Sequence, residues 1–127
     1  MKILGIGTDI VEVARIESLL ARHPERFAAR ILHANEYQRF TEVSKQAAWL
    51  AKRFATKEAV AKAFGTGIGK DVQLQEIETV HDARGKPLIQ FHGTTLTTTQ
   101  TLGVKSCELS VADERTHAVA FVILIGE

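Results

Sequence analysis

The feature that most constrains this chain is a long alanine-rich segment without proline that is closed by glycines. Apolar residues recur at helical spacing from about residue 44 to Phe64, which predicts one long helix with a broad buried stripe. Gly65 is the residue type that commonly ends a helix, and residues 65–69 form a glycine-punctuated loop. After this loop the apolar pattern changes from helical to strand-like. Helices and strands are therefore expected in separate blocks of the chain.

The other elements are expected in the order strand, three helices with the long one last, two strands, a helix and two strands. Residues 2–7 predict a short buried strand, and Asp9 with Glu12 has the spacing of a helix N-cap and capping box. Asn35 with Gln38 shows the same spacing before a short helix. Strands are expected at 72–82, 87–92, 105–111 and 117–125, and a helix at 93–102. This order predicts a single α+β domain over residues 1–127, with a mostly antiparallel sheet and helices packed on one side.

Composition excludes several classes of protein. The formal net charge of +1 does not indicate a nucleic-acid-binding protein. The single cysteine, Cys107, excludes an internal disulfide framework and fits a reducing cytoplasm. The longest apolar run, residues 118–125, is too short to cross a membrane. The apolar stretch at the N-terminus ends at Thr8 and is too short for the apolar region of a signal sequence. We therefore expect a cytoplasmic protein with neither a membrane nor nucleic acid as its partner.

Three charged residues are candidates for chemistry. Glu58 and Lys62 lie four residues apart, so both occupy one face of the long helix. Their ordinary interpretation is an exposed ion pair worth about 0.3–0.5 kcal/mol, and that of Asp9 is a helix cap worth about 1 kcal/mol. Alternatively, Asp9 and Glu58 together would suit Mg²⁺, which usually takes one or two carboxylates plus phosphate oxygens and water. Spacing by itself does not tell whether the two carboxylates meet.

Other residues give weaker indications. The glycine loop lacks the lysine of a P-loop, and it follows a helix where the Rossmann turn follows a strand. It therefore matches neither of these two common nucleotide-binding signatures. Arg15 and Arg22 are seven residues apart on one helical face, which is typical of a solvated face or of a docking surface for an acidic partner. Ser110 and Cys107 lack the sequence context of a nucleophile. No pair among the five histidines has helical ligand spacing with a carboxylate, so we expect them to be surface or strand residues.

Four stretches of the sequence are informative in combination. The first is Gly5-Ile-Gly-Thr-Asp-Ile10 with Arg15-Ile16 following, and the second runs from Arg53 through Lys57-Glu58 to Ile68. The third is Gly85-Lys-Pro87, and the fourth is the segment from Leu109 to Ala118. Together they resemble the motifs of the bacterial holo-[acyl-carrier-protein] synthases. The resemblance covers the whole chain, and the four motifs in combination are highly specific.

The resemblance implies a 4′-phosphopantetheinyl transferase that uses Mg²⁺. Such an enzyme moves the phosphopantetheine arm of coenzyme A to a serine of apo acyl carrier protein and releases adenosine 3′,5′-bisphosphate. The family fold is α+β and assembles into a homotrimer with coenzyme A bound between subunits. Carried over residue by residue, the resemblance implies Asp9 and Glu58 as metal ligands and catalytic residues, Lys62 as a catalytic phosphate contact, Arg15 and Arg22 as carrier-protein docking residues, and Arg53, Lys62, Gly65, Thr66, Gly67, Gly85 and Pro87 as coenzyme A-binding residues.

Two points stay open. Many relatives have a histidine in the last motif where this chain has Asp113, so any nucleotide contact of that histidine does not transfer. The proton of the attacking serine could go to Glu58, which we favour, to Asp9, or to a water molecule at the metal ion.

Two alternative functions are weighed against the enzyme. One is a module that binds coenzyme A or carrier protein without catalysis, and the other is a structural oligomeric subunit. Neither would need both carboxylates.

Overall fold

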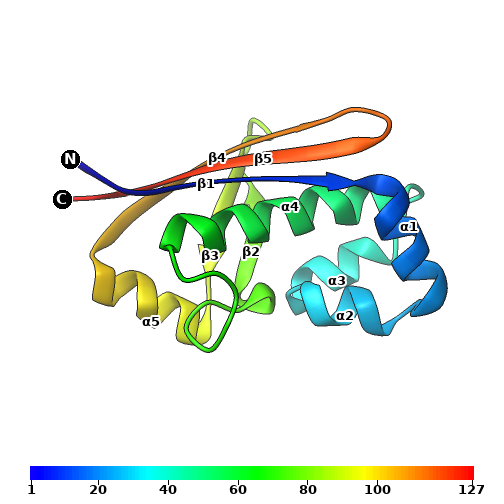
Figure 1. The fold of residues 1–127 in the computed structure, drawn as a ribbon, viewed down its shortest axis with the longest axis horizontal. Coiled ribbons are helices and arrows are strands. Elements are labelled where there is room, and N and C mark those ends of the chain that lie inside the picture. The colour runs from blue at the N-terminus through cyan, green and yellow to red at the C-terminus, as the bar shows by residue number, and fades with distance from the viewer.

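A long central helix, α4 (Gln46–Phe64), organises the computed structural model, which describes residues 1–127. Figure 1 shows α4 lying along one face of a three-stranded antiparallel sheet with strand order β1-β5-β4. Strands β2 and β3 form a separate two-stranded antiparallel hairpin. This is the α+β architecture predicted from the sequence. The remaining elements are β1 (Lys2–Glu12), α1 (Val13–Arg22), α2 (Arg26–Ile31), α3 (Ala34–Phe40), η1 (Leu74–Glu76), β2 (Ile77–His81), β3 (Pro87–Phe91), α5 (Gly93–Leu102), β4 (Val104–Asp113) and β5 (His117–Gly126).

Two glycines of β1 allow α4 to approach the sheet. A Cβ atom on Gly5 would lie 1.8 Å from the carbonyl oxygen of Ala63, and one on Gly7 would lie 1.8 Å from that of Ala59. Any larger residue would therefore push the helix away from the strand. Side chains alternate along a strand, so Asp9 points to the same side as Gly7. The close contact thus places Asp9 beside the face of α4.

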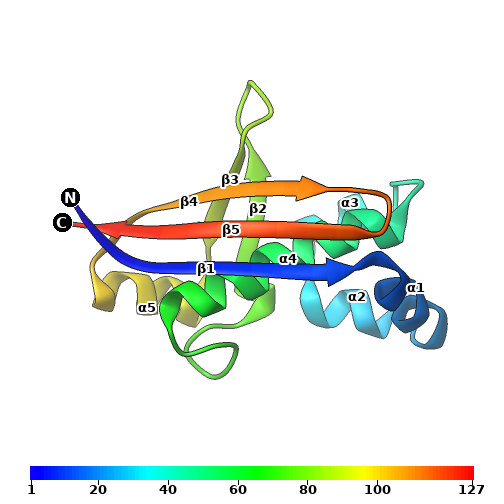
Figure 2. The ribbon, with the colours of Figure 1, turned by 45° about the horizontal axis from the view of Figure 1, so that its top comes forward.

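The β2–β3 hairpin projects past the β4 edge of the main sheet, as Figure 2 shows. Its turn is held by Asp82, whose carboxylate accepts hydrogen bonds from the backbone N–H groups of Arg84 at 2.8 Å and Lys86 at 2.9 Å. Gly85 has φ of 85°, a conformation that side chains rarely adopt. The turn therefore presents Pro87, the first residue of β3, at a defined position.

A buried ionic cluster ties α4 to α3 and to the segment that leads into β2. Lys57 Nζ donates to Glu36 Oε1 at 2.7 Å and to the carbonyl oxygens of Leu74 and Ile77. Arg53 Nε lies 3.3 Å from Glu36 Oε2. Burial lowers the pKa of Lys57, and the negative charge of Glu36 opposes that shift. Removing one member would leave an unpaired buried charge, so the cluster fixes the position of α4.

Two local predictions near the N-terminus are wrong. Strand β1 continues to Glu12, so Asp9 pairs with Ala120 of β5 and is not a helix cap. The N-cap of α1 is Glu12, which makes no side-chain cap hydrogen bond. The reason lies in the tertiary structure, because β5 supplies hydrogen-bonding partners along the whole of β1. This strand pairing outweighs a local helix cap at Asp9.

The cap of α3 is also displaced from the predicted Asn35. His33 Nδ1 accepts the Asn35 N–H at 3.1 Å, and the Glu36 carboxylate accepts the His33 N–H at 3.0 Å. This reciprocal pair is a capping box in which histidine takes the place of serine or threonine. The cap rules do not favour histidine, which is why the sequence pattern did not indicate it.

Later elements agree better with expectation. The threonine-rich segment forms α5, as predicted, because Glu76 accepts hydrogen bonds from the backbone N–H groups of Thr94 and Thr95 at its start. Strand β2 begins at Ile77 and not at residue 72, because residues 74–76 form a short 3-10 turn. No helix has both the length and the apolar character needed to cross a bilayer.

Candidate active site

The first group of the site joins the end of β1 to the second half of α4. Lys62 Nζ lies 3.0 Å from Asp9 Oδ1 and donates to the Thr8 carbonyl oxygen, also at 3.0 Å. Lys62 thus pairs with Asp9, 53 positions away in sequence, and not with Glu58 on its own helix. The Asp9 side chain is mostly buried and that of Lys62 is exposed, so the pair lies at the protein surface.

Glu58 lies in the electric field of this pair. Its pKa is raised, first by burial and then by the negative charge of Asp9, while the positive charges of Lys62 and Arg15 oppose the shift. The four charged side chains come from three elements, β1, α1 and α4, and the other three are close enough for their charges to act on Glu58. A carboxylate with a raised pKa is better suited to accept a proton near neutral pH.

Arg15 and Arg22 differ in their distance from this group. Both are exposed on α1, and Arg22 lies in its last turn. Arg15 is near enough for its charge to act on Glu58. The predicted basic face therefore begins at the carboxylates and continues along α1 away from them.

A second group lines a cavity of about 190 Å³ between α4 and the β2–β3 hairpin. Two buried polar atoms in its lining residues, Arg53 Nε and Thr79 Oγ1, make no hydrogen bond, although Arg53 lies within ion-pair distance of Glu36. Burial and then the positive charge of Arg53 lower the pKa of His81 at the rim. Polar groups without a hydrogen bond beside positive charge suit an anionic or hydroxyl-bearing ligand. The cavity is lined by Lys52, Arg53, Thr56, Thr79, His81, Pro87, Val111 and Asp113.

The backbone N–H groups of the three glycines in the glycine loop are hydrogen-bonded within the chain. Gly65 has φ of 83° and donates its N–H to the Lys62 carbonyl oxygen at 2.9 Å. The Gly67 N–H donates to the Ala61 carbonyl oxygen at 3.3 Å, and that of Gly69 to Val72 at 2.9 Å. The first two amides close the end of α4 and the third closes the turn after it, so none of the three is available to cradle a phosphate. Thr66 is exposed between them.

The residues predicted to bind coenzyme A fall into two places in one chain. Arg53 and Pro87 line the cavity, and Asp113 lines it with them. Lys62 belongs to the Asp9 group, and Gly65 to Gly67 follow it directly. Arg53 and Lys62 are nine residues apart on α4, which corresponds to about 13 Å of helix and to opposite sides of it. Within one chain, the residues predicted to bind coenzyme A therefore form two separate groups.

Sequence reasoning missed several residues here. Thr79, Lys52 and Thr56 line the cavity, yet no local pattern indicates them, because their positions depend on how the hairpin packs against α4. It also missed that His33 and His92 flank the carboxylate of Glu78. These three come from separate segments, so a search for helical ligand spacing did not find them.

Comparison with known proteins identifies the family of this chain. Residues 5–122 match the family described as the 4′-phosphopantetheinyl transferase superfamily. The holo-[acyl-carrier-protein] synthase of Halorhodospira halophila is 54% identical over 123 residues, which cover 97% of this chain and 98% of that protein.

Solved structures give the same result. The holo-[acyl-carrier-protein] synthase from Neisseria meningitidis superposes with a TM-score of 0.94 at 41% identity, covering 98% of this chain and 99% of the other. A holo-(acyl-carrier-protein) synthase from Bacillus anthracis, in complex with CoA (3′,5′-ADP), gives a TM-score of 0.82 at 38% identity and covers 98% of each chain. By sequence and by fold alike, this chain belongs to the holo-[acyl-carrier-protein] synthase family within the 4′-phosphopantetheinyl transferase superfamily.

Proposed function

We propose that this protein transfers the 4′-phosphopantetheine arm of coenzyme A to a serine of apo acyl carrier protein, as a step of fatty acid biosynthesis, and releases adenosine 3′,5′-bisphosphate. Family membership supports the reaction, and the observation that carries it in this chain is the meeting of Asp9, Glu58 and Lys62. A binding module has no need for two carboxylates at the same place. The single free cysteine, Cys107, supports a reducing cytoplasm as the compartment.

The donor set fits Mg²⁺. The carboxylates of Asp9 and Glu58 lie close enough for one to raise the pKa of the other, and only Asp9 has a lysine within ion-pair distance. Two carboxylates this close together, one of them without an ion-pair partner, suit a hard divalent cation with oxygen ligands. When bound there, Mg²⁺ would supply positive charge to the pyrophosphate oxygens.

The side chains have distinct tasks in this proposal. Glu58 accepts the proton of the serine hydroxyl, and Asp9 is the second candidate for that base. The serine oxygen forms a bond to the phosphorus that carries the pantetheine arm. The bond from that phosphorus to the oxygen of adenosine 3′,5′-bisphosphate breaks. Lys62, whose side chain is exposed, can turn from Asp9 to a phosphate oxygen as negative charge develops there.

The uncovered face of the main sheet supports a homotrimer. Ile6, Ile10 and Phe121 are exposed on the face opposite α4, with exposed fractions of 57%, 65% and 42%. Ile10 is paired with Val119 across the strands, so these side chains form one apolar strip. We propose that neighbouring subunits bury it. A shared site would also unite the two halves of the coenzyme A set, which lie on opposite sides of α4.

The basic face of α1 supports an acidic carrier protein as the second substrate. Arg15 lies beside the carboxylates, and Arg22 extends the positive charge along the helix. Such a surface raises the rate of encounter with an acidic partner at low ionic strength. The carrier would thereby present its serine near Glu58.

Mass spectrometry of apo acyl carrier protein incubated with this protein, coenzyme A and Mg²⁺ tests the proposal. We expect the carrier to gain the mass of one phosphopantetheine arm. Calorimetric titration with coenzyme A in the absence of carrier protein should measure coenzyme A binding separately. Coenzyme A binding without a gain in carrier mass would point to a binding module, and neither binding nor transfer would point to a structural subunit.

A further inference from the structure

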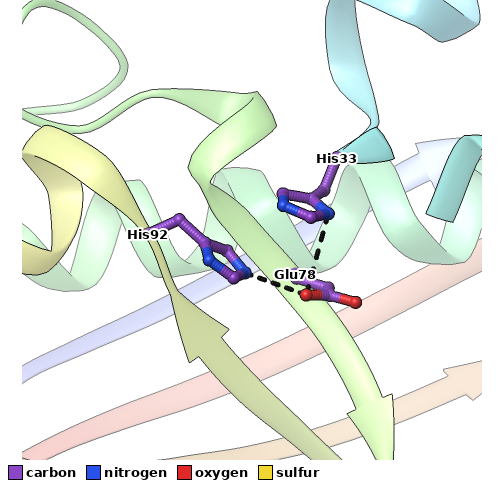
Figure 3. Close-up of side chains that lie close together, drawn as sticks. All are labelled: His33, Glu78 and His92. Atoms are coloured by element: carbon purple, nitrogen blue, oxygen red, sulfur yellow. Dashed lines mark hydrogen bonds and ion pairs between the residues drawn. The ribbon is translucent and has the colours of Figure 1, made fainter. Parts of the chain in front are cut away.

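Three side chains with metal-binding atoms converge away from the carboxylates of the proposed active site. His33 lies just before α3, Glu78 in β2, and His92 between β3 and α5. Figure 3 shows both imidazole rings directing a nitrogen edge toward the Glu78 carboxylate. The His92 Nε2 to Glu78 Oε1 distance is 2.8 Å, and that from His33 Nδ1 is 3.7 Å. All three ligand atoms lie within 4.8 Å of one another.

The surroundings are partly organised for binding. Glu78 is buried, with a side-chain exposure of 7%, and its second oxygen accepts a hydrogen bond from Asn35 Nδ2 at 3.3 Å. His33 Nδ1 accepts a backbone N–H, so that nitrogen carries a lone pair and no proton, the state that a metal ion needs. The two histidine side chains are 22% and 30% exposed, which leaves a path from solvent. A carboxylate fixed by an outer hydrogen bond is typical of a metal ligand.

The chemistry of the donors selects the metal class. Two imidazoles and one carboxylate suit zinc and neighbouring transition metals, whereas Mg²⁺ prefers oxygen ligands alone. Tetrahedral Zn²⁺ with ligand distances of about 2.0–2.2 Å holds its donor atoms about 3.3–3.6 Å apart. The present distances of 2.8 and 3.7 Å bracket that value. The two rings now stack with centroids 4.2 Å apart and 19° between their planes, so both must rotate until their nitrogen lone pairs converge on the ion.

We propose that His33, Glu78 and His92 bind one Zn²⁺-class ion, with water as the fourth ligand. The ion would join the start of α3 to β2 and to the start of α5, and so add to the backbone hydrogen bond from His92 N–H to the Glu76 carbonyl oxygen that already links the last two. Binding displaces the proton that His92 Nε2 shares with Glu78, and it takes the His33 lone pair from the Asn35 N–H. The ion therefore stabilises the positions of these three segments relative to one another. It is separate from Mg²⁺ at Asp9 and Glu58 and independent of the proposed reaction.

Calorimetric titration of the metal-stripped full-length protein with Zn²⁺ at neutral pH tests the site. We expect one ion per chain, and a melting temperature higher by about 10 °C when free Zn²⁺ is 100-fold above its Kd. His92→Gln and His33→Asn should each weaken binding by at least about 100-fold. The amide side chain introduced by His33→Asn keeps an oxygen that can cap α3, so this variant separates loss of the ligand from loss of the helix cap. Circular dichroism confirms that each variant is folded.

Two controls assign the signal to this site. His23→Gln removes an exposed histidine outside the cluster and should bind Zn²⁺ as the parent protein does. The double variant Asp9→Asn with Glu58→Gln removes the other carboxylates and should also retain binding. Absence of Zn²⁺ binding by the parent protein would overturn the proposal, because the cluster would then be a proton-linked pair only. Binding that is lost in the double variant but kept in His92→Gln would overturn it as well.

Discussion

Lys62 Nζ on α4 lies 3.0 Å from Asp9 Oδ1 on β1, although 53 positions separate the two residues in sequence. This contact depends on the glycines that let the helix lie directly on the strand, since Gly7 and Ala59 meet two residues before Asp9 and three before Lys62. The geometry of the site is therefore set by backbone packing. Changes in that packing should affect both stability and activity.

Replacement of Gly7 by alanine should separate β1 from α4. Its Cβ would lie 1.8 Å from the Ala59 carbonyl oxygen, so strand or helix must move. We expect a loss of about 3 kcal/mol in the free energy of unfolding and a large loss of transfer activity. Urea denaturation measures the first. Gly69→Ala is the control, because its Cβ would meet nothing within 4 Å, and a change below about 1 kcal/mol is expected there.

Replacement of Glu58 by glutamine should remove turnover and yet make the protein more stable at neutral pH. The pKa of Glu58 is raised in the folded protein by burial and by Asp9, so the ionised carboxylate destabilises the fold. The contribution of Glu58 to the stability of the folded state is therefore fully present below its unfolded-state pKa, where the carboxyl is protonated. This contribution is lost as pH rises through the folded-state pKa. The gain in Glu58→Gln should be below about 1 kcal/mol, because solvent screens a partly exposed group.

Denaturation of parent and Glu58→Gln proteins across pH checks the sign. The difference between them should be largest near neutral pH and should shrink in acid, where the parent carboxyl is protonated. Lower stability of the variant at neutral pH, or near-parental turnover, would contradict the assigned role.

Charge reversal at Arg15 and Arg22 should have different kinetic effects. Arg22→Glu should raise KM for the carrier protein several-fold with little change in kcat, and the effect should shrink at high ionic strength. Arg15→Glu should also lower kcat, because the Arg15 charge reaches Glu58. In both variants, KM for coenzyme A should change less. Equal changes of KM for both substrates would reject a docking role.

A charge on the exposed face of the sheet should prevent assembly. Phe121→Glu places a carboxylate in the centre of the apolar strip, between the neighbours Ile6 and Ile10 on β1. Burying that charge in an interface costs several kcal/mol, so sedimentation should show monomers where the parent protein is trimeric. Leu102→Glu changes an exposed leucine at the end of α5 and should leave the assembly intact. A monomeric parent protein would contradict the proposed trimer itself.

Local patterns determined much of this protein. The periodicity of residues 44–64 predicted α4 and the glycine at its end, because both depend on neighbours within a few residues. The same holds for the two hairpins, whose turns and alternating strands are local features. Glu58 and Lys62 could be chosen as candidates because they share one face of that helix. The motifs were also enough to show a resemblance to the correct family.

Tertiary structure decided what those residues face. Asp9 has the spacing of a helix cap, but pairing with Ala120 makes it part of a strand and turns its side chain toward Lys62. His33, Glu78 and His92 meet because three segments pack together, and no local spacing records that contact. The physical reason is the range of the forces involved. Propensity and periodicity act within a few residues, whereas the positions of charged groups relative to one another follow from close packing of β1 on α4, which is complete only when the whole chain has folded.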